Sequence, residues 1–132
     1  MSTSPAACVA AFHEAFGLVA QDRPSPVSSE VMRQRQQLLE EEGCEVAAAV
    51  RGGRLEEIAQ ELADLVYVAY GTALAYGIDL DAVIAEVHRA NLSKLGDDGQ
   101  PVVRDGKVVK SARFQRPDVA AVLRAQGWVN QP

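Results

Sequence analysis

The chain has 132 residues, of which 48% are hydrophobic and 23% charged, and its net charge is −5 at neutral pH. This length and composition are typical of one soluble globular domain and exclude a disordered chain. Because the basic residues are scattered through an acidic chain, we expect no nucleic-acid partner. No apolar run is long and uncharged enough to cross a membrane, so no membrane partner is expected either. Cys8 and Cys44 have no CxxC spacing, which predicts a reduced, cytoplasmic protein.

The N-terminal half of the chain predicts two helices joined by a loop. Apolar residues recur on one side of a helix over residues 5–17, and Gly17 can end it. The prolines and serines of QDRPSPVSS predict a loop. Ser28 or Ser29 can then cap a long second helix over residues 30–50.

The third predicted helix runs from Leu55 to Gly77 and is apolar nearly all round beyond Leu62. A helix with apolar residues on every side has no face for solvent. It should therefore be the central helix of the fold or be buried between copies of the chain. We expect at least a homodimer, with a homotetramer left open.

The C-terminal part predicts a fourth helix, a hairpin and a short last helix. Asp79 can cap the fourth helix and Gly96 can end it. Asp105-Gly106 lies between two short valine-rich runs, which is a strong signal for a two-stranded β-hairpin. A final helix follows over residues 118–126. The predicted fold is all-α: an antiparallel bundle of four to five helices with a small C-terminal β-hairpin, in a single domain over residues 1–132.

Two acidic residues of the second predicted helix, Glu42 and Glu45, share a stripe with apolar residues. At about 100° per residue, they lie within about 60° of Leu38 and Ala49 on a side that should face a core. Like charges at this spacing repel, and buried carboxylates are costly unless they are neutralised. Glutamates are also common on solvated helix faces, so this pair alone does not establish a site.

Glu61 and Asp64 repeat the three-residue spacing on the third predicted helix. Asp64 stands in an apolar stretch that offers no Lys or Arg nearby. A hard divalent cation bound by oxygen ligands would remove both the repulsion and the burial penalty. Oxygen-only ligands suit Mg²⁺ or Mn²⁺ better than Zn²⁺, and such ions neutralise phosphate charge and activate water. The two acidic pairs together therefore predict a metal site.

These motifs resemble those of a known family. EEGCE at 41–45 followed by ELAD at 61–64 is similar to the EExxE and ExxD motifs of the all-α nucleotide pyrophosphohydrolases. This is the MazG-like superfamily, which includes dimeric dUTPases and phosphoribosyl-ATP pyrophosphohydrolases. FHEAFG near the start, and the tail HRANLSKLGDDGQPVVRDGKVVKSARFQRPDV, resemble the small MazG-like members. The tail departs from the expected form after Lys110, where SARFQ replaces a segment rich in proline and glycine.

The resemblance implies Mg²⁺-dependent hydrolysis of a nucleoside or deoxynucleoside triphosphate to the monophosphate and pyrophosphate, as in nucleotide-pool house-cleaning. Mn²⁺ is a possible substitute. The implied metal ligands are Glu42, Glu45, Glu61 and Asp64. Glu41 is either a further ligand or the catalytic base that orients water. The implied substrate contacts are Asn91 for the sugar or base and Lys94 and Lys110 for the phosphates.

Two alternatives stay open at this point, and a third is discounted. Within the superfamily, phosphoribosyl-ATP hydrolysis is the nearest rival, and the preferred base and sugar are undecided. A non-catalytic helical module that only dimerises would leave the acids in solvent. A di-iron carboxylate bundle needs Glu-x-x-His, whereas the chain has Glu86-x-His88, so we discount it.

Overall fold

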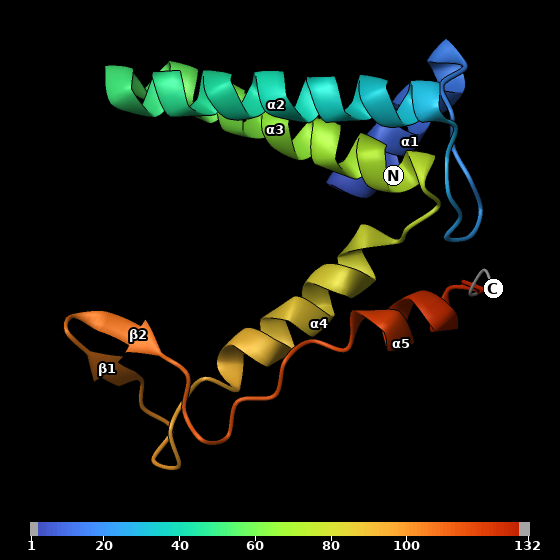
Figure 1. The fold of residues 1–132 in the computed structure, drawn as a ribbon. Coiled ribbons are helices and arrows are strands. Elements are labelled where there is room, and N and C mark those ends of the chain that lie inside the picture. Colours follow the sequence, from blue (N-terminus) through green and yellow to red (C-terminus); the bar gives the residue numbers. More distant parts are fainter. Residues whose placement is uncertain (1–2, 130–132) are drawn as a thin grey trace. The chain divides into compact units, whose positions relative to one another are not determined.

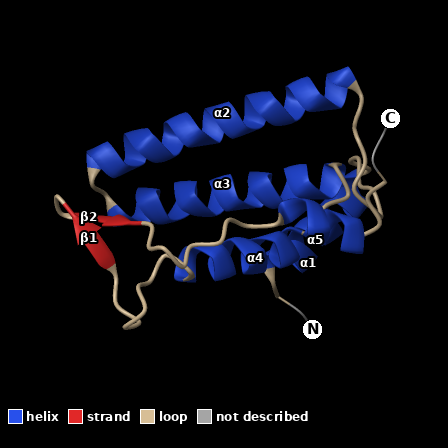
Figure 2. Cartoon of the chain, turned by 60° about the horizontal axis from the view of Figure 1, so that its bottom comes forward, coloured by secondary structure: helices blue, strands red, loops and turns tan. Residues whose placement is uncertain are grey.

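The computed structural model describes residues 3–129 and is mostly helical (Figure 1). Its contacts divide into two compact units, one reaching to Asp79 with Val129 added, the other spanning Leu80–Trp128. The first unit contains α1 (Pro5–Phe16), α2 (Ser29–Gly52) and α3 (Leu55–Ala75). The second unit contains α4 (Leu80–Leu92), β1 (Val102–Arg104), β2 (Lys107–Val109) and α5 (Val119–Ala125). Five helices with one small hairpin near the C-terminus confirm the predicted fold class (Figure 2). The single domain over residues 1–132 stays a prediction.

Capping groups fix the ends of the first two helices, and the sequence predicted two of these groups, Gly17 and Ser28. The Ser28 hydroxyl accepts a hydrogen bond from the Val31 backbone N–H at 3.2 Å, so Ser28 rather than Ser29 is the N-cap of α2. Gly17 and Gly53 follow α1 and α2 with φ angles of 65° and 77°. This left-handed conformation favours glycine and ends a helix.

One stripe of α2 is covered by neighbouring elements, and α3 packs against both α2 and α1. The half-buried or buried positions of that stripe are Val31, Arg35, Leu39, Glu42, Val46 and Ala49. Their spacing of three or four residues places them on one side of the helix. The predicted stripe was therefore wrong at two positions, because Leu38 and Glu45 are exposed. The covered side depends on the direction from which α3 approaches, which α2 alone does not specify.

α3 combines a covered side with an exposed apolar side. Gly71, Ala73 and Ala75 are buried at its C-terminal end. Leu62 and Val66, in contrast, are 46% and 44% exposed. Among the described residues, no single helix is long and apolar enough to cross a membrane. α3 and α4 reach the required length and apolar composition only when they are counted together, and the chain bends sharply between them.

The second unit is built from α4, α5 and the hairpin. β1 and β2 are antiparallel, with Val103 opposite Val108. Asp105 and Gly106 connect them with φ angles of 52° and 76°, as the predicted Asp-Gly turn requires. α4 packs against α5, whose N-cap is the Asp118 side chain.

Candidate metal centre

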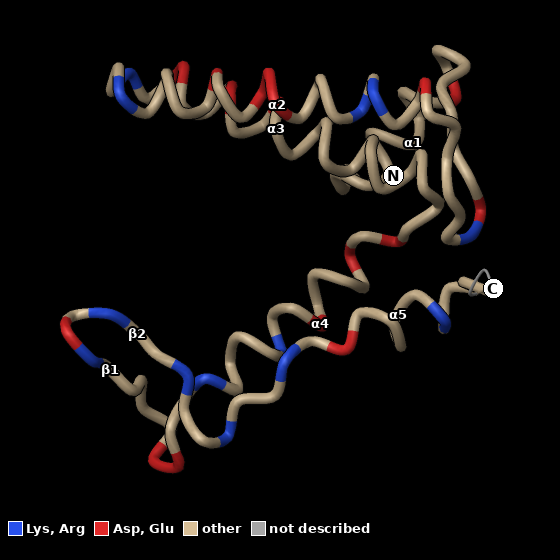
Figure 3. The backbone as a smooth tube through the Cα atoms, in the orientation of Figure 1, with Lys and Arg blue, Asp and Glu red and all other residues tan. Residues whose placement is uncertain are grey.

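Three carboxylates from α2 and α3 converge in the first unit. One oxygen from each of Glu42, Glu45 and Glu61 lies within 4.8 Å of the other two. Both helices place these residues about two to three turns from the short connection between them, so an antiparallel pair brings them to a similar height. In Figure 3, several acidic residues (red) follow one another along the second half of α2, and others are spread over the rest of the chain. The structure thus brings together three of the four residues that the sequence assigned to a metal.

Two of these carboxylates are left incompletely satisfied. The Oε2 atoms of Glu42 and Glu61 are buried, and no described residue gives either a hydrogen-bond partner. A buried carboxylate oxygen without a partner costs free energy. A divalent cation with oxygen ligands would satisfy both atoms, and an all-carboxylate donor set fits Mg²⁺ or Mn²⁺. The residues therefore fit a hard divalent metal.

The electrostatics of the cluster favour neutralisation. Burial raises the pKa of Glu42, and so do the charges of Glu45 and Asp64 and a hydrogen bond with the Glu45 carboxyl. For Glu61, the hydrogen bond with Glu45 is the largest cause that raises the pKa, followed by burial and the neighbouring negative charges. Both shifts arise because several negative groups share a partly dehydrated site, which is the situation that a bound cation relieves.

Asp64 lies beside the cluster without being among its three converging carboxylates. It is half-buried on α3, one turn after Glu61. Its negative charge contributes to the raised pKa of both Glu42 and Glu61. A ligand role for Asp64 stays a prediction that this proximity supports.

Glu40 and Glu41 are exposed and differ from the clustered acids in their partners. The Glu41 carboxylate accepts a hydrogen bond from Gln37 at 3.0 Å, and the Glu40 carboxylate accepts one from Gln36 at 3.1 Å. Glu41 is close enough for its charge to raise the pKa of Glu42. The two residues therefore form a matched pair, of which Glu41 is the one nearer the cluster.

The three predicted substrate contacts lie in the second unit. Asn91 is exposed on α4, and Lys94 is half-buried in the turn that follows. The Lys110 ammonium lies 4.8 Å from the centre of the Phe114 ring, a cation–π contact within the unit. Their roles in substrate binding stay predictions.

A comparison with known families assigns the chain. The family model of phosphoribosyl-ATP pyrophosphohydrolases matches residues 9–91, which is more than half of the chain. The chain belongs to this family. The matched range contains all four predicted metal ligands and Glu41. Within the superfamily, the match favours the phosphoribosyl-ATP pyrophosphohydrolases, which the sequence analysis gave as the alternative to hydrolysis of an ordinary nucleoside triphosphate. No curated protein matches the chain.

The sequence did not predict the contacts of Arg35. Arg35 lies on the covered stripe of α2, and its guanidinium donates hydrogen bonds to the Thr72 hydroxyl and the Val68 carbonyl oxygen of α3. A signal was present, because Gly71-Thr72 interrupts the apolar run of the third helix. Only the pairing of the two helices reveals that this interruption accommodates an arginine.

Proposed function

We propose that this protein hydrolyses phosphoribosyl-ATP to phosphoribosyl-AMP and pyrophosphate, with Mg²⁺ held by Glu42, Glu45, Glu61 and Asp64. The observation that carries the proposal is the convergence of carboxylates with two unsatisfied buried oxygens, inside the range that the family model matches. Mg²⁺ at such a site would neutralise phosphate charge and lower the pKa of water. Mn²⁺ has the same preference for oxygen ligands.

The chain's own residues have separate tasks in this reaction. The α–β phosphoanhydride bond breaks, water supplies the oxygen that replaces the bridging oxygen, and pyrophosphate leaves. Glu42 and Glu61, half-buried where α2 packs against α3, would hold the metal. Glu41, exposed beside them, orients the water or accepts its proton.

A second candidate is the hydrolysis of an ordinary nucleoside or deoxynucleoside triphosphate. The observation that favours it is the C-terminal segment, whose resemblance to small MazG-like proteins begins at His88 and extends beyond residue 91, where the family match ends. Both candidates share the metal site and the release of pyrophosphate. They differ in the group attached to the nucleotide.

The assembly and location are part of the proposal. We propose a homodimer or homotetramer in the cytoplasm, without nucleic-acid or membrane partners. The exposed apolar side of α3, with Leu62, Val66 and Tyr67, supports an interface between copies.

A substrate panel tests the proposed reaction. The full chain with Mg²⁺ is incubated with phosphoribosyl-ATP, ATP and the deoxynucleoside triphosphates, and pyrophosphate and phosphate are measured separately. We expect pyrophosphate, with the highest kcat/KM for phosphoribosyl-ATP and none in EDTA or in Glu61→Gln. Turnover of deoxynucleotides without phosphoribosyl-ATP would favour the second candidate. An inert protein would favour a non-catalytic helical module.

A further inference from the structure

The first unit contains a second polar site, separate from the acid cluster. A cavity of about 230 Å³ lies between α1, the segment after it, α2 and the end of α3. Its apolar wall includes Leu18 and Val31, and its polar groups are His13, Gln34 and Arg35. Apolar walls with a few convergent polar groups are typical of ligand pockets.

Arg35 enters this cavity as a fixed and unpaired cation. Its Nε lies 3.1 Å from the Thr72 hydroxyl, and its Nη2 lies 3.0 Å from the Val68 carbonyl oxygen, so α3 holds the guanidinium plane. Within the described part of the chain Arg35 makes no ion pair, and its Nη1 is open to solvent, where an anion can reach it. Burial also lowers the pKa of Arg35, because its charge is partly removed from water. A guanidinium in this state favours an anion.

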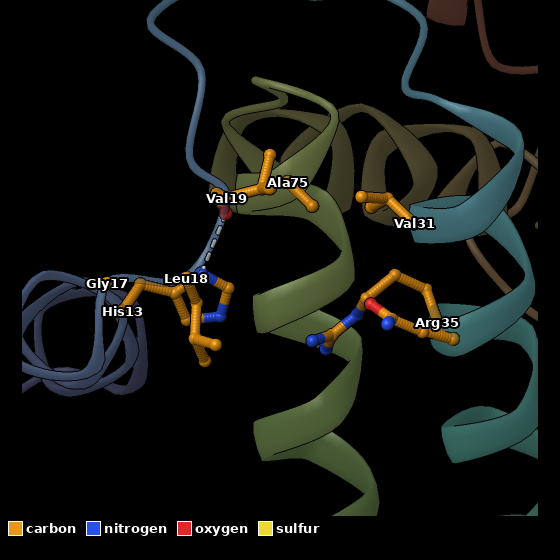
Figure 4. A pocket seen from close by; sticks show the side chains of 8 residues that line it. His13, Gly17, Leu18, Val19, Val31, Arg35 and Ala75 are labelled. Atoms are coloured by element: carbon orange, nitrogen blue, oxygen red, sulfur yellow. Dashed lines mark hydrogen bonds between the residues drawn. The ribbon is translucent and has the colours of Figure 1, made fainter.

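His13 supplies a second group on the opposite side of the same cavity. Its side chain is 3% exposed, and Nδ1 lies 2.9 Å from the Val19 carbonyl oxygen. Because a carbonyl only accepts, Nδ1 carries the proton. Nε2 is then the acceptor of a neutral ring, and it donates to an anion only when the ring is an imidazolium. Figure 4 shows His13 and Arg35 coming from different helices and pointing toward one another across α3.

Gly71 allows both groups to approach one point on α3. A Cβ atom at this position would lie 2.6 Å from Arg35 Nη2 and 2.9 Å from His13 Nε2. Both distances are shorter than any tolerated contact of a Cβ atom, so another residue would displace these side chains. The glycine thus preserves a place where two nitrogen-bearing groups converge.

The position of this cavity relative to the acid cluster indicates its ligand. Arg35 and Glu42 lie on the same covered stripe of α2, seven residues apart, which is about 10 Å along the helix. Phosphoribosyl-ATP carries one phosphate on its second ribose, remote from the triphosphate. ATP has no second ribose and therefore lacks this remote phosphate. We infer that the His13–Arg35 pocket binds this remote phosphate and so selects phosphoribosyl-ATP over ATP. This inference rests on the proposed function.

A binding experiment tests the pocket without requiring turnover. The full chain is melted with and without millimolar ribose 5-phosphate in EDTA, so that no metal can hold the phosphate at the acid cluster. We expect a rise in Tm for wild type and for Arg33→Met, whose arginine is exposed on the same helix. Arg35→Met should lose the rise. Should wild type show no rise, or should Arg35→Met keep it, the pocket is not a phosphate site and Arg35 only joins α2 to α3.

Kinetics then link the pocket to the substrate. Arg35→Met should raise KM for phosphoribosyl-ATP by about 10- to 100-fold relative to any change for ATP, as expected for a lost charge-assisted hydrogen bond. Equal changes for both substrates would show that the pocket holds the shared part of the nucleotide, and would overturn the inference. The protein could also show a Tm rise that depends on Arg35 and yet fail to hydrolyse phosphoribosyl-ATP. This result would support the phosphate site and contradict the proposed function.

A second variant covers the case in which Arg35→Met does not fold. Val31 lies one turn before Arg35 on the same stripe and lines the cavity. Val31→Glu places a carboxylate where it can pair with Arg35 at i,i+4 spacing, which keeps the guanidinium satisfied and occupies the anion site. It should fold and lose the ribose 5-phosphate effect. A Tm rise that persists in Val31→Glu contradicts the inference.

Discussion

Glu42 and Glu61 each keep a buried carboxylate oxygen that no described residue satisfies. Neighbouring Glu40 and Glu41 differ from them, because each is exposed and accepts a hydrogen bond from a glutamine one turn earlier. The four residues show how position alone divides chemically identical side chains between a candidate site and a solvated surface. Glu41 is exposed like Glu40, but its negative charge contributes to the raised pKa of Glu42.

The first prediction concerns the task of Glu41. Glu41→Gln should retain metal and nucleotide binding but lower kcat by about 10²- to 10⁴-fold, because it removes the group that positions or deprotonates water. Glu40→Gln is the matched control and should change little. Pyrophosphate release and metal affinity are measured for both variants. Full activity in Glu41→Gln would exclude it as the base, and an inactive Glu40→Gln would show that the active face of α2 has been misplaced.

At the scale of elements, α2 carries a glycine in the middle of its acidic motif. Gly43 is exposed, and a Cβ atom there would meet nothing within 4 Å. Glycine lowers helix stability by about 1 kcal/mol relative to alanine in such a position. Gly43→Ala should therefore raise the free energy of unfolding by about that amount in urea titrations. Gly71→Ala is the contrasting control and should lower it, because its Cβ would overlap Arg35.

A destabilised Gly43→Ala would contradict this reading of α2. It would show that Gly43 is covered by another surface in the folded protein.

The link between α4 and α5 gives a prediction about pH. Hydrogen bonds from Arg89 and from the Asp118 backbone N–H lower the pKa of Glu86 from 4.5 to about 2. The folded state therefore favours the ionised carboxylate, which stabilises the unit fully above about pH 4.5. This contribution is lost as the pH falls toward 2.

Glu86→Gln should accordingly lower Tm at pH 7, and its difference from wild type should shrink steadily as the pH approaches 2. Glu14→Gln, at an exposed position of α1, is the control. Thermal unfolding between pH 7 and pH 2 checks this. A Tm difference that is independent of pH would mean that Glu86 acts by packing and not by charge.

Local signals explain which elements the sequence predicted correctly. Ser28, Gly17 and the Asp105-Gly106 turn act within a few residues, so their effects do not depend on the rest of the fold. The covered stripe of α2 was misplaced at Leu38 and Glu45 because a second helix decides which side is covered. The Arg35 contacts with α3 were not predicted for the same reason: they join residues more than thirty positions apart in the sequence.

At the scale of the whole molecule, little of the apolar surface is fully buried within the described residues. The buried hydrophobic residues are Val9, Ala49, Ala73, Ala75 and Ala90. Large apolar side chains such as Leu62 and Tyr67 remain 46% and 39% exposed on α3. The acid cluster and the His13–Arg35 pocket both lie in the first unit, whereas Asn91, Lys94 and Lys110 lie in the second.

Exposed apolar surface of this kind predicts association. The protein should be a dimer or tetramer by light scattering at micromolar concentration, because burying the exposed side of α3 removes apolar surface from water. Val66→Asp should weaken the assembly, and Glu14→Gln should not. A wild-type protein that is monomeric under these conditions would contradict the prediction.

The central claim is that the acids of α2 and α3 hold a divalent metal, and a Mn²⁺ titration followed by electron paramagnetic resonance tests it most directly. Wild type should bind Mn²⁺ and be stabilised by roughly 2.7 kcal/mol when free metal is a hundredfold above Kd. Asp64→Asn should keep its fold, bind Mn²⁺ at least about tenfold more weakly and release no pyrophosphate. It should also be no less stable than wild type without metal, because a repelling charge is removed. A wild-type protein that leaves Mn²⁺ free in solution, or an Asp64→Asn variant that binds it equally well, would contradict the account.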